Sequence, residues 1–377
     1  MLEFAGILSK RASRFCAIYL RYIVVSIYLL VVSFGASIGG LAAWASILLG
    51  GSLYPILDAV PWRGFDARES SVSTHHRSKL QVFGLYLVAQ SAVIFWILYL
   101  TTVRDYTMWE WVGIGLSLGT LTGGIGIPAA HELIHCKSRL GRAMGLYLLM
   151  TVNYMHFRIE HIYGHHRHVA TPQDPATARK GEGLWQFIPR SIVGQIKGAY
   201  SIDERMRNKK GKRLGLPNRV VQYAAIQAGV LGVVYISFGS VGLWLMLIQS
   251  ITAIIFLEAT NYVEHYGLLR QEYNGRREAV SELHSWSTGS LLTNSIAFNL
   301  GLHADHHAHP DRPFSELRNL ITAPQLPAGY LAMFSIAAVP PIWTRMMDPR
   351  VDRLLERQSE KSPNHKLQKE STNGPQY

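Results

Sequence analysis

The alternation of apolar and polar stretches along the chain predicts a helical membrane protein. Six apolar segments approach or exceed the roughly 20 residues that a helix needs to cross a bilayer. They cover residues 17–35, 38–58, 80–101, 111–130, 219–237 and 241–262. Buried helices of a soluble protein are the alternative, but six such segments in one chain favour membrane spans. We therefore expect an all-α integral membrane protein with about six transmembrane helices.

The first apolar segment follows positive charges, as in a secretory signal peptide. No small-x-small cleavage site with a polar mature start follows it, and the apolar sequence continues almost to residue 60. We expect an uncleaved first span.

Basic residues in the connections predict the orientation of the spans. They gather before the first span (Lys10, Arg11, Arg14, Arg21), after the second (Arg63, Arg68, Arg77, Lys79) and within 131–215. The opposite connections hold almost none, with Arg104 as the exception. By the positive-inside rule, both termini and the 131–215 region are cytoplasmic.

This pattern predicts one membrane-embedded domain over residues 1–350. Its cytoplasmic cap is expected from residues 131–218 and 263–350, and the polar stretch 351–377 is expected to be a disordered tail. Inverted internal repeats, which are common in transporters, are not evident.

Composition narrows the possible partners. The formal charge of +12 would suggest nucleic acid in a soluble protein, but with 48% hydrophobic residues it is better explained by loops that face anionic lipid. No nucleic-acid partner is expected. The two cysteines, Cys16 and Cys136, form no CxxC pair, so these residues contain no rubredoxin or zinc-ribbon module.

Most of the sixteen histidines fall into four groups, HELIH, EHIYGHH, NYVEHYG and GLHADHH. The first and third groups follow predicted spans, and the other two lie in segments of the same membrane face, so all four can converge. Nine are candidate metal ligands: His131, His135, His161, His165, His166, His265, His303, His306 and His307. Nine imidazoles exceed the roughly four ligands of one metal and fit two. Imidazole suits iron, copper, zinc and nickel alike.

Carboxylates accompany the histidine groups. Glu132, Glu160, Glu264 and Asp305 are expected to accept the ring N–H of ligating histidines, which orients the rings. Solvated or structural positions, or direct ligation, are the alternatives. The single histidines His156, His168, His284 and His309 lie near the groups, and their roles stay open.

The histidine groups resemble the three histidine boxes of membrane fatty-acid desaturases and hydroxylases. NYVEHYGLLRQ, GHHRHVATPQDPATAR and HADHHAHPDRPFSELR resemble the alkane 1-monooxygenase family over most of residues 50–350. The resemblance implies that the nine histidines bind two iron ions in a non-haem diiron centre. It also implies hydroxylation of medium- or long-chain n-alkanes to 1-alcohols with O2. Electrons would come from rubredoxin, or a ferredoxin, and its reductase.

The resemblance further implies a bacterial cytoplasmic (inner) membrane, from whose lipid the alkane is drawn. Six glycines could leave room for the alkane between helices or allow close helix packing: Gly39, Gly40, Gly50, Gly51, Gly123 and Gly124. The basic stretch 209–213 could attract an acidic rubredoxin or lipid headgroups.

The chain departs from the family at HELIHC, where HELGHK is usual, and at GLH, where QRH is common.

Three other functions share part of this sequence pattern. Aromatic-methyl hydroxylases share a version of NYVEHYG, whereas desaturases do not. A metal transporter would carry its ligands near the bilayer midplane, but here the histidines lie at one face. A sensor or scaffold that keeps the metal site is a further alternative.

Overall fold

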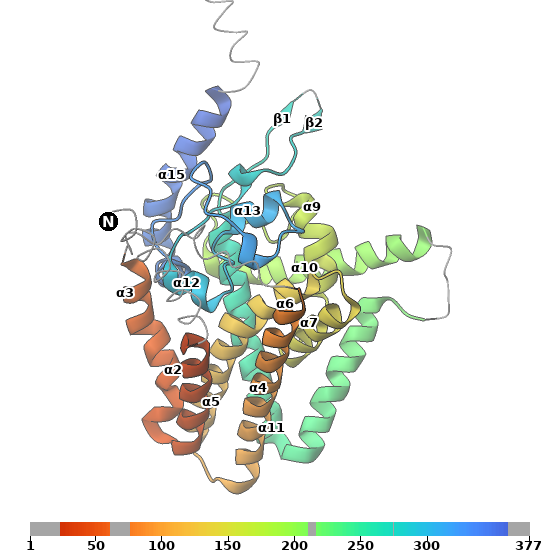
Figure 1. The fold of residues 1–377 in the computed structure, drawn as a ribbon, viewed down its shortest axis with the longest axis vertical. Helices are drawn as coiled ribbons and strands as arrows, with labels where there is room; N and C mark the ends of the chain where they lie inside the picture. Colours follow the sequence, from red (N-terminus) through yellow and green to blue (C-terminus); the bar gives the residue numbers. More distant parts are fainter. Residues whose placement is uncertain (1–22, 61–75, 210–215, 274, 361–377) are drawn as a thin grey trace, which may run out of the picture.

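The computed structural model describes residues 23–60, 76–209, 216–273 and 275–360, and it is predominantly helical. Long helices run side by side in one half, and shorter helices gather at one end of them (Figure 1). The described residues contain one small sheet, in which β1 (Glu272–Tyr273) pairs antiparallel with β2 (Arg276–Arg277). The architecture is an all-α bundle with a helical cap.

Four helical segments of the described residues are long and apolar enough to cross a membrane. They are Gly40–Ala59, Leu80–Val103, Met108–Ile134 and Arg219–His265, and a shorter apolar helix, Ile23–Ile38, precedes them. The first contains η1 (Gly40–Trp44), α2 (Ala45–Leu48), η2 (Leu49–Leu53) and α3 (Tyr54–Ala59). The second belongs to α4 (His76–Val103), and the third contains α5 (Met108–Leu121), η4 (Thr122–Gly126) and α6 (Ile127–Ile134). The fourth is α11 (Arg219–His265).

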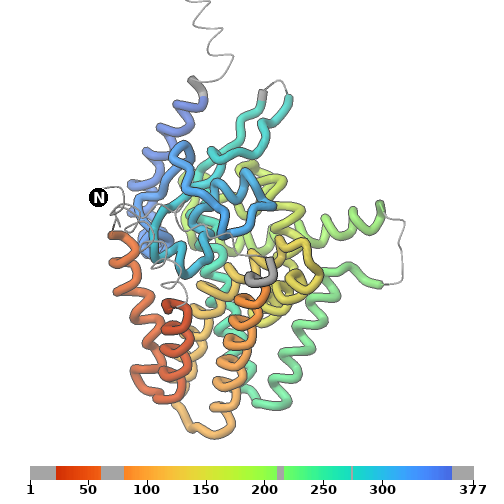
Figure 2. Tube along the Cα trace, viewed as in Figure 1, coloured from red at the N-terminus to blue at the C-terminus, as the bar shows by residue number. Residues whose placement is uncertain are grey.

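Helix α11 consists of two apolar limbs. Gly239 has a φ of 69°, a left-handed conformation that glycine adopts without strain. The chain turns back there, from green to cyan in Figure 2. The limbs correspond to the predicted segments 219–237 and 241–262. In the described residues all six predicted segments are thus helical except at Gly39, while residues 17–22 lie outside the described part. The count of six membrane crossings stays a prediction.

A row of glycines holds α5 closely against α11. Gly115, Gly119 and Gly123 are spaced four residues apart, so they lie on one helical face. A Cβ at Gly115 would lie 2.9 Å from the Ile248 side chain, one at Gly123 would lie 2.7 Å from the Ala253 Cα, and one at Gly119 would overlap α11. The close approach fixes α6, which continues from α5, relative to the end of α11.

The cap is built mostly from short helices, together with two helices of 26 and 21 residues. Its elements before α11 are α7 (Arg139–Thr151), α8 (Phe157–Glu160), η5 (His161–His165), α9 (His166–His168) and α10 (Leu184–Lys209). Those after α11 are η6 (Glu282–His284), α12 (Leu291–Ile296), α13 (His303–Ala308), η7 (Phe314–Glu316), α14 (Tyr330–Ala337) and α15 (Pro340–Glu360). These elements fall within the ranges expected for the cap or extend just beyond them. That the cap faces the cytoplasm stays a prediction.

An aromatic core attaches the last helices to the end of α11. Trp286 and Trp343 are fully buried there with Tyr262 and Tyr266. The disordered tail was expected from residue 351, but α15 continues through Glu360, because Val351 is buried in this same core. Residues 361–377 lie outside the described part of the chain.

Candidate metal centre

All nine histidines expected to be ligands gather in two clusters at the end of the bundle. The five-histidine cluster contains His131, His135, His161, His166 and His306, and the four-histidine cluster contains His165, His265, His303 and His307. Within each cluster, the candidate ligand atoms all lie within 4.8 Å of one another. The residues come from segments that are far apart in the chain, so the fold itself assembles both clusters.

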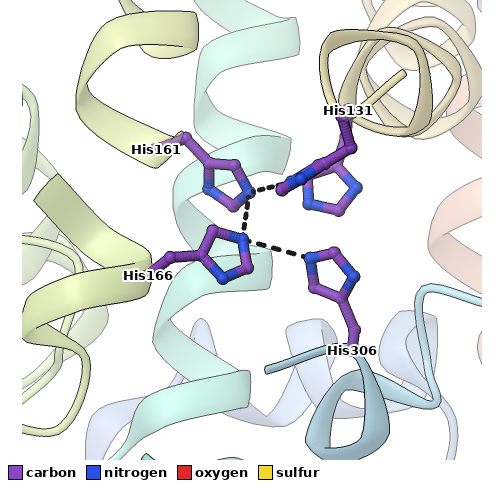
Figure 3. Close-up of side chains that lie close together, drawn as sticks. His131, His161, His166 and His306 are labelled. Carbon is purple, nitrogen blue, oxygen red and sulfur yellow. Dashed lines mark hydrogen bonds between the residues drawn. The ribbon is translucent and has the colours of Figure 1, made fainter. Parts of the chain in front are cut away.

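Three segments supply the five-histidine cluster, and their rings point toward one another (Figure 3). The Nε2 atom of His161 lies 3.1 Å from that of His135 and 3.1 Å from that of His166. The Nε2 atoms of His166 and His306 are 3.2 Å apart. His131 comes from α6, and its ring centroid is 4.5 Å from that of His161. Each ring thus directs a nitrogen toward a common point.

The four-histidine cluster has the same form. His303 on α13 places its Nε2 atom 3.1 Å from that of His265 and 2.9 Å from that of His307. The Nε2 atoms of His165 and His307 are 3.2 Å apart. His265 is the last residue of α11, and therefore the close packing of α5 on α11 sets its position relative to His131.

A π-helical turn decides which histidine enters which cluster. Residues His161–His165 form η5, in which hydrogen bonds link residues five apart. His161 and His166 therefore share the five-histidine cluster, and His165 is directed to the other. Residues four apart share a face of a regular α-helix, but the π-helical turn places His161 and His165 in different clusters. In α13 the spacing holds, because His303 and His307 share a cluster.

Both clusters fit metal ions. Two imidazole nitrogens bound about 2.1 Å from one metal, at angles between about 90° and 109°, lie about 3.0–3.4 Å apart. The observed Nε2 separations of 2.9–3.2 Å are close to this range. His131 Nε2 is buried and has no hydrogen-bond partner among the described residues, as a nitrogen reserved for a metal would be.

The rings are held in the form that binds metal. Burial, and then neighbouring histidines, lower the pKa of His161, His166 and His306 well below the ordinary histidine value. Burial lowers the pKa of His135 to about 4. At neutral pH these imidazoles are therefore uncharged and keep a lone pair for a cation.

Asp174 orients one of the rings, and sequence reasoning missed it. Its Oδ2 atom accepts a hydrogen bond from His165 Nδ1 at 2.9 Å, and Thr177 Oγ1 donates to the same oxygen at 2.6 Å. This contact leaves His165 Nε2 free to face the cluster, which is the usual arrangement behind a metal-binding histidine. The only signal was its place in TPQDPATAR, close after the second histidine group.

A backbone carbonyl does the same for His265. Its Nδ1 atom lies 3.3 Å from the carbonyl oxygen of His284, and the His284 side chain contacts Glu278 at 2.9 Å. His284 is thus placed behind the cluster and acts through its backbone. The sequence had left its role open.

Among the four predicted carboxylates, Glu264 lies against a ligand ring. Its Oε2 atom is 3.1 Å from His303 Nε2, the nitrogen that faces the cluster, and Tyr330 OH donates to its Oε1 atom at 2.6 Å. A residue that orients the ring would instead contact Nδ1, and His303 Nδ1 has no hydrogen-bond partner among the described residues. Glu264 is therefore placed as a candidate ligand, one of the alternatives left open for it.

The other three carboxylates have different surroundings. Glu132 accepts a hydrogen bond from the Phe314 N–H at 3.3 Å. Asp305 accepts from Arg312 and from the Arg318 N–H at 2.9 Å, which ties α13 to the following loop. Glu160 is buried, and burial raises the pKa of its carboxyl well above the usual value. The expected role of orienting ligand rings stays a prediction for these residues.

Two apolar pockets that share part of their lining lie beside the clusters, and together they are named the apolar pocket, with an outer and an inner part. Its outer part is lined by Gly124, Phe256, Ile296, Tyr330, Leu331 and Phe334, among others. Its inner part is lined by residues that include His131, His161, Phe157 and His303, and the two parts share Gly123, Pro128, Thr260 and Leu300. A Cβ at Gly124 would meet nothing within 4 Å, so this glycine leaves open space, whereas Gly123 also serves close helix packing.

A second, polar pocket reaches the five-histidine cluster. His135 and His306 line it together with Glu132, Lys137, Asp311 and Arg312, and it encloses about 1020 Å³ with its open mouth. The centre therefore has one apolar approach and one polar approach.

Apolar helices that end in two histidine clusters define a membrane protein with a histidine-rich metal centre. A family model described as fatty acid desaturase matches residues 107–337. Alkane 1-monooxygenase 2 of Pseudomonas aeruginosa is 38% identical over 318 residues, which cover 82% of this chain and 84% of that protein. Alkane 1-monooxygenase 2 of Alcanivorax borkumensis is 38% identical over 70% of both chains. The chain belongs to the alkane 1-monooxygenase family.

A more distant relative has a different name. The xylene/toluene monooxygenase hydroxylase component of Pseudomonas putida is 30% identical over 61% of this chain and 62% of that protein.

Proposed function

We propose that the protein is a non-haem diiron monooxygenase that hydroxylates the terminal methyl group of medium- or long-chain n-alkanes. The reaction consumes O2, two electrons and two protons, and yields a 1-alcohol and water. Family membership supports alkane oxidation by this chain. The observation that carries the proposal is the apolar pocket, because His131, His161 and His303 from both clusters line its inner part.

The nine histidines would hold two irons, one in each cluster. Two bound irons supply the reduction of O2 and the oxidation of a C–H bond, for which acid–base side chains have no means. Asp174 fixes the tautomer and orientation of His165 through their 2.9 Å contact. Glu264 has an oxygen 3.1 Å from His303 Nε2, so it can add a carboxylate to the four-histidine site.

The pocket would select and position the substrate. Its outer wall contains Phe256, Leu331 and Phe334, which make van der Waals contact with an alkane but offer it no polar group. Such a lining also limits water near the clusters. A terminal methyl group in the inner part would lie among Pro128, His131 and His161, which line it. The chain end, rather than an internal carbon, then faces the histidines.

The apolar helices point to a membrane location for the enzyme. We place it in a bacterial cytoplasmic membrane, with the cap and the clusters on the cytoplasmic side, as the basic loops indicate. Its alkane substrate would then reach the pocket from the lipid. Residues 1–22 and 361–377 lie outside the described part of the chain.

Electrons would come from reduced rubredoxin, or a ferredoxin, with its reductase. The polar pocket supports a donor on the cap side, because it brings His135 and His306 toward the surface. Most of the basic stretch 209–213, which was expected to attract an acidic donor, lies outside the described residues. A donor protein that does not touch the histidines directly would then pass its electrons to them through this pocket or from its rim.

The test combines metal analysis with product analysis in membranes that also contain a rubredoxin and its reductase. Octane and hexadecane are supplied to these membranes, and iron is counted by mass spectrometry in the enzyme after its purification from them, because rubredoxin carries iron of its own. About two irons per chain with 1-alcohol, both reduced in His165→Ala, would support the proposal. Two irons with oxidation of p-xylene but of neither alkane would favour an aromatic-methyl hydroxylase, which the 30% identical relative makes the second candidate. Zinc without an oxygen-dependent product would refute both.

A further inference from the structure

Asp58 is a buried carboxylate that lies outside both histidine clusters. It stands near the end of α3, where its side chain is 2% exposed. Its Oδ1 atom accepts hydrogen bonds from Ser290 Oγ and from the Thr293 N–H at 3.2 Å. Its Oδ2 atom accepts from the Leu331 N–H at 2.9 Å, and Thr293 Oγ1 lies 2.9 Å from both oxygens. A carboxylate with this many donors is well stabilised despite its burial.

These donors belong to the first turns of two helices. Ser290 is the N-cap of α12, and Gly329 is the N-cap of α14. The Gly329 N–H donates to the Asp58 backbone oxygen at 3.2 Å, and a Cβ at Gly329 would overlap the Asp58 carboxylate. The carboxyl group thus lies at the N-terminal ends of both helices. One side chain thus anchors α12 and α14 to the membrane helix that ends at Ala59.

The two anchored helices form one wall of the apolar pocket. Helix α12 contributes Thr293 and Ile296, and α14 contributes Tyr330, Leu331 and Phe334. The Tyr330 N–H donates to Thr293 Oγ1 at 2.8 Å, so a hydrogen bond also links α14 to α12 beside Asp58.

The wall is coupled to the four-histidine cluster. Tyr330 OH donates to Glu264 Oε1 at 2.6 Å, and Glu264 Oε2 lies 3.1 Å from His303 Nε2. A displacement of α14 would therefore change both the shape of the pocket and the position of this carboxylate. Asp58 touches neither the pocket nor a histidine, so it acts through other residues.

We propose that Asp58 is a positioning residue that determines which carbon of a bound alkane faces the histidine clusters. The inference rests on the proposed function, because it concerns the regiochemistry of the same reaction. With Asp58 in place, α12 and α14 are held in one position and the chain enters in one register. Without the Asp58 carboxyl group, α12 and α14 can move, and internal methylene groups of the alkane also reach the clusters. The enzyme then forms 2-alcohols beside 1-alcohols.

The test measures the ratio of 2-octanol to 1-octanol in membranes that contain full-length enzyme and its donor. Asp58→Asn keeps the shape but replaces one acceptor oxygen by an NH2 group that faces backbone N–H donors. We expect this ratio to rise about tenfold, with the iron content unchanged; tenfold corresponds to about 1.4 kcal/mol between the two transition states. Ser46→Ala is the matched control, since Ser46 is buried and hydrogen-bonded in the same span but does not line the pocket. It should leave the ratio unchanged.

A second variant keeps the proposal testable if Asp58→Asn does not fold. Thr293→Val puts a methyl group in place of the hydroxyl that contacts both carboxylate oxygens and accepts from the Tyr330 N–H, and it should raise the ratio in the same direction by a smaller factor. A wild-type product ratio in an iron-loaded Asp58→Asn enzyme would overturn the proposal. If that variant does not accumulate, a wild-type ratio in Thr293→Val would do so.

Hydrogen–deuterium exchange separates this proposal from the proposed function. In Asp58→Asn, either the Thr293 amide or the Leu331 amide loses its acceptor, because each bonds to a different carboxylate oxygen, and peptides that contain the starts of α12 and α14 should exchange faster. If the wild-type enzyme forms no alcohol, the proposed function fails, while faster exchange confined to these peptides would still establish the anchoring role. Unchanged exchange there would refute that role, whatever the product.

Discussion

The Nε2 atoms of His161 and His166 lie 3.1 Å apart, although five residues separate them in the chain. The π-helical turn His161–His165 brings them to one face and directs His165 to the other cluster. Successive histidines of one short motif therefore serve two different sites, and their substitutions should have different effects.

The first prediction compares these histidines. His165→Ala leaves three imidazoles and the Glu264 carboxylate in the four-histidine cluster, one imidazole fewer than His161→Ala leaves in the other, so we expect the loss of about one iron per chain and of about 100-fold in product formation. His161→Ala leaves four imidazoles in the other cluster, which still suffice for one metal, so the iron content should remain near two and activity should fall about tenfold. Iron analysis and 1-alcohol yield measure both effects. His309→Ala, at an exposed position, is the control, and equal loss of iron from both cluster variants would contradict the assignment.

The second prediction concerns Asp174. Asp174→Asn replaces a charged acceptor of the His165 Nδ1–H by a neutral one, and changes of this kind typically cost 10- to 100-fold in metal affinity or activity. We expect about tenfold weaker iron retention during titration with a chelator. Asp352→Asn is the control, because Asp352 is half-exposed and pairs with Lys180 away from the clusters. Equal retention in Asp174→Asn and in the wild type would exclude an orienting role.

The third prediction is a dependence of stability on pH. Burial lowers the pKa of His156 to about 4, from an ordinary value of 6.5. Between these two values the unfolded chain binds a proton that the folded chain does not, so the contribution of His156 to stability falls as the pH drops from about 6.5 to 4. The full effect is about 3 kcal/mol.

His156→Phe removes this titration and keeps a ring against Tyr154, whose ring centroid lies 4.3 Å away. The unfolding temperature of the purified protein, followed between pH 7.5 and 4.5, should fall less in the variant than in the wild type. His309→Gln should follow the wild-type curve. If His156→Phe shows the same fall as the wild type, the buried imidazole does not cause it.

The fourth prediction concerns the length of the pocket. Gly124 leaves open space in the outer part of the apolar pocket, so Gly124→Leu should shorten the room for a chain. Conversion of hexadecane should fall about tenfold more than conversion of octane, because the shorter chain avoids the added side chain. Competition between the two alkanes gives this ratio directly. Gly229→Leu places the same side chain in open space on α11, outside the pocket, and should leave the ratio unchanged.

The long helices were predictable because the length and polarity of a segment decide whether it forms an apolar helix. Apart from Gly39, all six apolar segments are helical in the described residues, and the break between 219–237 and 241–262 occurs at Gly239. The boundary of the tail was not predictable in this way. Residues after 351 are polar on average, and only tertiary packing shows that α15 continues, because Val351, Leu354 and Leu355 pack against the aromatic core.

The ligand set was readable from histidine spacing, but its division between two clusters was not. The π-turn inserts an extra residue into one helical turn, and nothing in EHIYGHH marks it. The turn packs closely against α10, where a Cβ at Gly164 would lie only 3.0 Å from the Ile202 side chain. Such tertiary contacts are not visible in the sequence. Asp174 escaped notice for a related reason, because it contacts His165 from a loop and follows no helical period.

Helix α13 supplies His306 to one cluster and both His303 and His307 to the other. During synthesis, therefore, neither cluster has its full set of imidazoles until the ribosome has passed residue 307, long after the membrane helices have been made. Until then His131 and His265 lie at the ends of their helices without the other histidines of their clusters. Metal loading should consequently be a late step of biogenesis, and a nascent chain stalled before α13 should be inserted in the membrane but leave each cluster short of ligands.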